Sequence, residues 1–162
     1  MDALDHIQAL WAQQMPELDT SSMALIGRLQ IVHKQLTQAM TQTFRQFGLT
    51  DAGFDVLATL LRSGPPHALT PKQLLAQLLV TSGSMTSRLD SLEKQGLIER
   101  TVGTNDKRQR QVQLTQRGRG VIEQAVVAHV ETQKKLLRVL NQQEQQEFTE
   151  MLRTFMARSA TA

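Results

Sequence analysis

Side chains that can bind a phosphate backbone or a base edge are concentrated between residues 72 and 110. Guanidinium and ammonium groups bind phosphate oxygens, and hydroxyl groups make hydrogen bonds to phosphates and to base edges. Here the hydroxyl groups gather at the start of one predicted helix, and the charged groups gather at the tip of a predicted hairpin. The candidate contacts to double-stranded DNA are Lys72, Gln73, Ser82, Ser84, Thr86, Ser87, Arg88, Lys107, Arg108 and Arg110, with Asp106 supporting the hairpin tip.

Arg108 carries the sharpest of these predictions, because a guanidinium at a hairpin tip can enter a narrow, electronegative minor groove. Lys107 and Arg110 fit phosphate contacts, which make binding sensitive to salt. Each position also has a purely structural interpretation. The hairpin tip can be a solvated charged turn, Ser82 can cap a helix, and Lys72 and Gln73 can face solvent.

Two short helices and a hairpin are needed to position these side chains. Thr70 followed by Pro71 predicts the start of a helix over residues 70–79, since threonine caps helices and proline favours their first position. A second helix follows and ends at Gly96, and the alternation around Val112 predicts a half-exposed strand. Helix, helix and basic hairpin together are the parts of a winged helix-turn-helix, which reads DNA with one helix in a major groove.

The rest of the chain has the 3.6-residue apolar periodicity of helices. It predicts a helix over residues 2–14 and a longer one that starts after the capping residues 19–22 and ends at Gly48. A third helix is expected to start at the cap Thr50 and to bury Phe54, Leu57, Leu60 and Leu61. Two more are expected over residues 116–140 and around Phe148, Leu152 and Phe155. We expect a mainly α fold with a small β-wing, a winged helix-turn-helix flanked by N- and C-terminal dimerisation helices. The predicted parts are 1–48 (an extra helix plus a dimerisation helix), 49–118 (the winged helix) and 119–162 (dimerisation helices). The end helices have more apolar face than so small a domain can cover, which favours a two-fold homodimer.

Composition supports a globular protein with an uneven charge distribution. The chain has 162 residues, 40% of them hydrophobic, and a formal net charge of +3. Residues 84–120 hold eight lysines and arginines against four acidic residues, whereas residues 1–60 hold three against six. The positive excess lies where phosphate contacts are expected. The N-terminus lacks the basic start and apolar stretch of a signal peptide, which predicts a cytoplasmic protein.

Several classes of chemistry have no support in the sequence. Cysteine is absent, which excludes disulfides, thiolate metal sites and cysteine nucleophiles within this chain. The four histidines lack metal-ligand spacing, and the sequence holds no serine elbow, paired-carboxylate site or phosphate loop. We therefore expect no enzyme, no metal and no cofactor.

The whole pattern resembles the MarR family of bacterial transcription regulators. The matching pieces are the leucine-rich helix 70–79, the SxxxTxRLDxLEKxGLIxR run from Ser82 to Arg100, the wing tip 106–108, and residues 112–115 followed by Gly118. Flanking helices at both ends agree, so the resemblance covers nearly the whole chain. It implies a homodimer that binds a pseudo-palindromic operator and that a small ligand, often an aromatic acid, releases from DNA.

Four residues resemble a constellation in the urate-responsive branch of that family: Trp11, Asp55, Arg88 and Arg100. In chemical terms, two guanidinium groups would hold an anionic purine, the indole would stack on its plane, and the carboxylate would accept an N–H group. The resemblance implies a repressor that urate or a related purine releases.

Other interpretations stay open at this point. Trp11 can be a packing anchor, and Arg88 can pair with Asp55, Asp90 or Glu93 rather than with DNA or ligand. The regulator can respond to phenolic acids or to no ligand. A winged helix can also serve protein–protein binding, with no operator.

Overall fold

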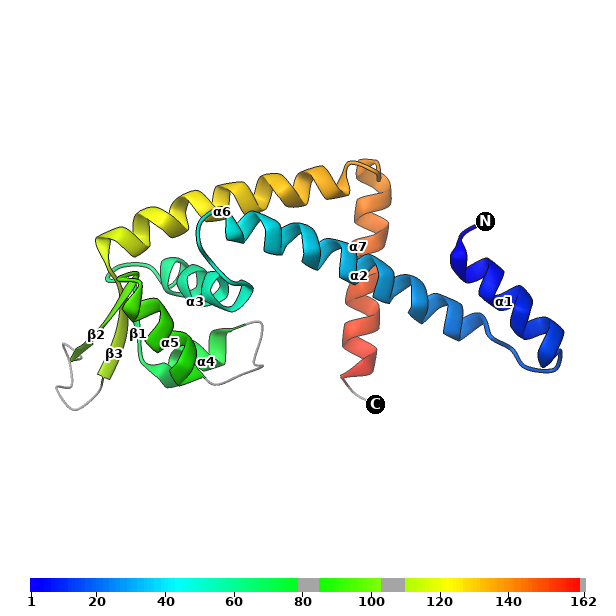
Figure 1. Cartoon of the computed structure of the whole chain (residues 1–162), viewed down its shortest axis with the longest axis horizontal. Helices are drawn as coiled ribbons and strands as arrows, with labels where there is room; N and C mark the ends of the chain where they lie inside the picture. The colour runs from blue at the N-terminus through cyan, green and yellow to red at the C-terminus, as the bar shows by residue number, and fades with distance from the viewer. Residues whose placement is uncertain (79–84, 103–109, 161–162) are drawn as a thin grey trace. The chain divides into compact units, whose positions relative to one another are not determined.

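The computed structural model describes residues 1–78, 85–102 and 110–160. The chain forms two compact units, Met1–Gln42 and Thr43–Ala162. Figure 1 shows the helical character of both units and the small sheet of the second. The elements in chain order are α1 (Ala3–Gln14), α2 (Ser21–Arg45), α3 (Asp51–Arg62), β1 (Ala68–Leu69), α4 (Pro71–Gln77), α5 (Met85–Lys94), β2 (Ile98–Val102), β3 (Arg110–Leu114), α6 (Gln116–Leu137) and α7 (Gln142–Ser159).

Helix starts follow the capping residues of the sequence. The predicted caps at Thr50 and Thr70 are confirmed, because their hydroxyl groups accept hydrogen bonds from the main-chain N–H groups of Gly53 and Gln73. Thr115 caps α6 in the same way. The mainly helical fold with a small wing is therefore as predicted, although α4 ends at Gln77 and α6 at Leu137, earlier than the apolar periodicity suggests.

The wing is a three-stranded antiparallel sheet in the order β1-β3-β2. The two strands of the predicted hairpin are present and antiparallel, and Arg100 pairs with Val112 while Val102 pairs with Arg110. The sequence pattern does not predict the third strand. It has only two residues, Ala68 and Leu69, too few to show an alternating pattern, and it exists because β3 offers a free edge for pairing.

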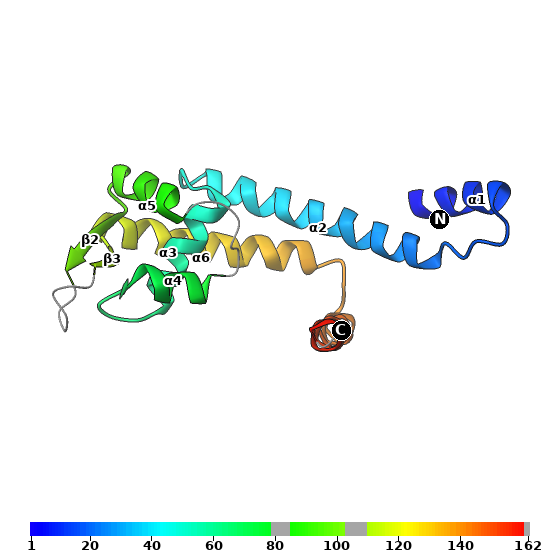
Figure 2. The ribbon, with the colours of Figure 1, turned by 90° about the horizontal axis from the view of Figure 1, so that it is seen from below.

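The core of the second unit lies between α3, the sheet and α6. Val56, Leu57, Leu60, Ile98 and Ile122 are almost completely inaccessible to solvent. Figures 1 and 2 show α3, α4 and α5 gathered beside the wing, with α6 running away from it.

The start of α6 lies unusually close to the wing. Gly118 is buried there, and a Cβ atom at this position would overlap the main-chain carbonyl of Leu97. The Thr115 hydroxyl donates to the Gly96 carbonyl oxygen at 2.7 Å, which holds the same junction together. The local sequence around Gly118 indicates only a bend, whereas the structure requires glycine for close approach.

Within the second unit, aromatic rings join the last turn of α2 to α3. Phe44 stacks on Phe54 of α3 with ring centroids 4.0 Å apart. Phe54 is half-buried rather than a full core residue, and Leu61 is half-buried too. A hydrogen bond of 2.8 Å between the Thr43 and Thr132 hydroxyl groups adds a polar tie to α6.

In the first unit, α1 is fastened to α2. Arg28 donates to Asp2 at 2.8 Å and to Asp5 at 2.5 Å, and the bond from Arg28 holds the pKa of Asp2 below its usual value. Leu4 packs over Gly27, where a Cβ atom would come within 2.7 Å of the leucine side chain. No helix in the described part of the chain has the length and apolar character needed to cross a membrane.

Candidate nucleic-acid interface and ligand site

The described part of the predicted DNA interface is carried by α4, α5 and the start of β3. Lys72, Thr86, Ser87 and Arg110 are exposed, while Arg88 is half-buried. Their side chains lie on the two helices of the helix-turn-helix and on the adjoining wing strand. The remaining predicted positions, Ser82, Ser84, Asp106, Lys107 and Arg108, lie outside the described residues.

Gln73 has a local role in addition to its predicted one. Its side-chain oxygen accepts hydrogen bonds from the main-chain N–H of Thr70 at 2.9 Å and from the Thr70 hydroxyl at 3.0 Å, which completes a capping box. The carboxamide therefore stabilises the start of α4, and contact with DNA stays a prediction for this residue.

The end of α4 is bound by a side chain from α3. Arg62 donates to the main-chain carbonyl of Gln77 at 2.5 Å. Carbonyl groups in the last turn of a helix lack partners within the helix, so this contact satisfies one of them. It fixes the end of α4 at the point where the chain leaves toward α5.

A charge cluster joins the wing to α5. Arg100 of β2 forms ion pairs with Asp90 and with Glu93, the second at 3.0 Å. The hydrogen bond to Asp90 raises the pKa of Arg100, although partial burial works against it. Asp90 and Glu93 are possible partners of Arg88 on sequence grounds, and in the structure both bind Arg100. The sequence shows one part of this cluster, because two acidic residues spaced three apart in a helix lie on the same face. It does not show which basic residue binds them.

A groove of about 440 Å³ lies between α4, α5 and the wing strands. Leu75, Met85, Leu89 and Val112 give it an apolar floor, and Thr86, Arg100 and Arg110 add polar groups. The strand register puts Arg100, Arg110 and Val112 on one face of the hairpin, since Arg100 pairs with Val112 and Arg110 lies diagonally opposite. Two guanidinium groups beside an apolar floor suit a flat ligand that carries negative charge.

The four predicted ligand residues differ in their surroundings. Arg88 lines a smaller pocket of about 50 Å³ with Thr50, Gly53 and Ser91, so Arg88 and Arg100 line different pockets. Asp55 is only 9% exposed in the middle of α3 and lines neither pocket. Trp11 belongs to the first unit, where it is 36% exposed.

Metal binding has no candidate in the described chain. Among the residues that the structure describes, no cluster of three or more histidine or acidic side chains could hold a metal ion.

Comparison with known proteins decides the family. The sequence model of the MarR family matches residues 47–109, which begin just after α2 and include the elements from α3 to β2. The HTH-type transcriptional regulator PecS of Dickeya dadantii (strain 3937) is 35% identical over 134 residues, which cover 83% of this chain and 81% of PecS. The chain belongs to the MarR family.

Further relatives agree with that membership. The HTH-type transcriptional repressor YetL of Bacillus subtilis (strain 168) is 28% identical over 141 residues, covering 87% of this chain and 84% of YetL. The crystal structure of a mutant MarR from E. coli in complex with operator DNA has a TM-score of 0.69 at 26% identity, covering 90% of this chain and 97% of that one. This MarR-family chain is thus a winged-helix, DNA-binding transcriptional regulator and not an enzyme.

Proposed function

We propose that this MarR-family protein is a cytoplasmic repressor that binds a pseudo-palindromic operator as a homodimer and leaves it when a small aromatic anion binds. The observation that carries the DNA part is the exposed face of α5, where Thr86 and Ser87 are accessible and Thr86 lines one groove with Arg110 of the wing. This surface supports base contacts from α5 and phosphate contacts from the wing. Residues 82–88 and 106–110 are its proposed extent.

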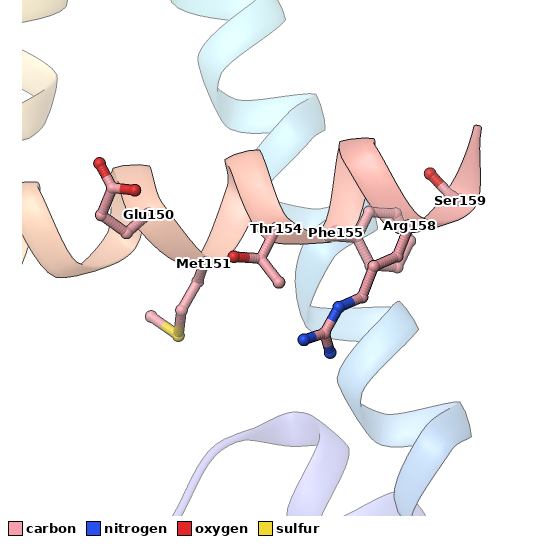
Figure 3. Close-up of a pocket in the computed structure, with 6 residues that line it drawn as sticks. All are labelled: Glu150, Met151, Thr154, Phe155, Arg158 and Ser159. Atoms are coloured by element: carbon pink, nitrogen blue, oxygen red, sulfur yellow. The ribbon is translucent and has the colours of Figure 1, made fainter. Parts of the chain in front are cut away.

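The homodimer is supported by apolar surface that the chain leaves uncovered. Helix α7 has no buried residue, and its Met151, Thr154, Phe155 and Arg158 line one open pocket (Figure 3). Spacings of three and four residues put these side chains on one helix face. In the first unit, Leu25 is 60% exposed and Ile26 is 47% exposed. We assign residues 1–48 and 119–162 to dimerisation and 49–118 to DNA binding.

The ligand part is supported by the groove with Arg100. Urate is a flat anionic ring: its negative charge suits the two guanidinium groups of the groove, and its flat face suits the apolar residues beside them. We keep Trp11, Asp55, Arg88 and Arg100 as the proposed ligand residues and urate or a related purine as the proposed ligand. Phenolic acids are the alternative ligands, because a carboxylate or phenolate on a flat ring has the same requirements.

A DNA-binding assay separates these proposals. We expect the purified protein to bind the DNA upstream of its own gene and urate to weaken that binding. The Arg108→Ala variant should bind more weakly and lose about one unit of salt slope, because one phosphate or minor-groove contact is gone. Arg119→Ala is the matched control, since Arg119 is paired with Glu123 on α6.

Each result has a distinct meaning. Binding that urate does not change would keep the regulator and refute urate as its ligand, and benzoate and salicylate would then be titrated. Trp11 is the single tryptophan of the chain, so its fluorescence reports whether a ligand stacks on it. Absence of any salt-sensitive binding, at this DNA and in a genome-wide selection of sites, would favour the protein-binding alternative.

A further inference from the structure

Arg100 connects the two parts of the DNA-reading surface. It stands on β2, in the strand pair that carries the wing, and both of its ionic partners stand on α5. The helix and the strand lie side by side in both views of the molecule (Figures 1 and 2). Arg100 thus links the wing to α5, the helix whose hydroxyl groups are predicted to contact DNA.

The charge of α5 shows what Arg100 contributes beyond this link. Without Arg100, the described helix carries Arg88 and Lys94 against Asp90 and Glu93, so its formal charge is zero. Carboxylates close to a DNA backbone repel its phosphates over about 8–10 Å at physiological salt. Arg100 binds both carboxylates, and its charge brings the total for α5 plus Arg100 to a net positive value. Glu99, the other charged residue of β2, points to the opposite face of the strand from Arg100.

The same ion pairs are accessible enough to be exchanged. The side chains of Arg100, Asp90 and Glu93 are 33%, 56% and 38% exposed. Ion pairs with this much exposure are weak because water competes for both charges. Arg100 also lines the groove with Arg110, which makes no ion pair with any described residue, so an anion entering there meets both guanidinium groups.

We propose that Arg100 is a positioning and charge-compensating residue for DNA binding: it neutralises Asp90 and Glu93 on α5, and an anionic ligand weakens DNA binding by competing with these carboxylates for it. Release of the two carboxylates would restore their repulsion of DNA and loosen the link between α5 and the wing. The competition step rests on the ligand part of the proposed function, whereas the compensation step requires only that the protein binds DNA.

A double-mutant cycle tests the compensation step. The four proteins are the wild type, Arg100→Gln, the pair Asp90→Asn with Glu93→Gln, and the triple variant. We expect Arg100→Gln to weaken operator binding roughly three- to tenfold and the triple variant to recover most of that loss. Recovery must exceed the gain that the two carboxylate changes give in the wild-type background, because only then do the three residues act as one unit.

The controls separate this role from loss of fold and from a direct DNA contact. Thermal unfolding of each variant shows whether it folds. If Arg100→Gln does not fold, the variant with both Asp90→Asn and Glu93→Gln still tests the proposal, because it retains Arg100. That pair should bind operator at least as tightly as the wild type. Arg119→Gln breaks a comparable exposed pair on α6 and should leave operator binding unchanged. Unchanged binding by Arg100→Gln, or effects that simply multiply across the cycle, would overturn the proposal.

Urate titration by calorimetry tests the competition step. The variant without the two carboxylates should bind urate several-fold more tightly than the wild type, yet urate should weaken its operator binding less. Equal urate affinity in both proteins would overturn competition. If the wild type binds no urate, the ligand part of the proposed function fails and competition by urate fails with it, while the cycle still decides the role of Arg100 in DNA binding.

Discussion

The helices around the wing and the helix at the C-terminus bury their apolar residues to very different extents. Six of the twelve residues of α3 are buried, whereas α7, with eighteen residues, has none. Leu57 and Leu60 are inaccessible to solvent, while Phe155 and Met156 are 62% and 68% exposed. The apolar side chains of α3 are covered by other parts of the same chain, whereas the apolar side chains of α7 are exposed to solvent.

This difference separates what stabilises the fold from what builds the assembly. Apolar burial stabilises by about 25 cal/mol per Å², so α3 contributes to stability in a single chain. Helices in proteins gain most of their stability from packing of an apolar face, so the exposed apolar face of α7 needs a surface to cover it. We therefore expect substitutions in the two regions to affect different measurements.

The largest effect on folding should come from Leu57. Leu57→Ala leaves a cavity in a fully packed site and should lower the free energy of unfolding by about 2–5 kcal/mol. Val139→Ala removes apolar atoms from a residue that is 84% exposed, and it should change the free energy of unfolding by about 0.5 kcal/mol or less. Urea denaturation measures both, and equal losses would remove the distinction between a buried and an exposed apolar residue.

The next effect concerns assembly rather than folding. Phe155→Glu puts a charge in the middle of the exposed apolar face of α7, which a partner would have to desolvate. We expect monomers by light scattering and operator binding weakened by at least about tenfold, as for loss of a central aromatic contact. Gln146→Glu adds the same charge at another exposed position of α7 as a control. A Phe155→Glu protein that stays dimeric would show that this face is not the interface.

The sequence predicts the features that depend on local chemistry. Caps at Thr50 and Thr70, the order of helices and the hairpin all follow from residue type and periodicity over short stretches. The strand at Ala68 could not be predicted, because its pairing depends on a strand more than forty residues away. In the candidate site, the exposed hydroxyl groups of α5 could be predicted. The pairing of Arg100 with Asp90 and Glu93 could not, since it arises only when β2 lies beside α5.

The smallest effect on stability should come from His129, which lies at the edge of the core of the second unit. Its side chain is neither fully buried, as in α3, nor exposed, as in α7. Its ring is 5.1 Å from that of Phe44 and 4.9 Å from that of Phe54, and its buried Nδ1 has no hydrogen-bond partner in the described chain. Burial lowers the pKa of His129 below its ordinary value of 6.5, because charging the ring there is unfavourable.

A lowered pKa in the folded state fixes the direction of the pH dependence. Well above pH 6.5 the ring is neutral whether the protein is folded or unfolded, so its contribution to stability is complete. As the pH falls below 6.5, the unfolded chain takes up a proton more readily, and the free energy of unfolding decreases. His129→Leu removes this proton uptake, so its unfolding midpoint should fall less than that of the wild type between about pH 7 and 5. His33→Gln, at an exposed position of α2, should keep the wild-type slope. Parallel curves for the wild type and His129→Leu would mean that solvent reaches the ring freely, and that the closed core ends before α6 reaches His129.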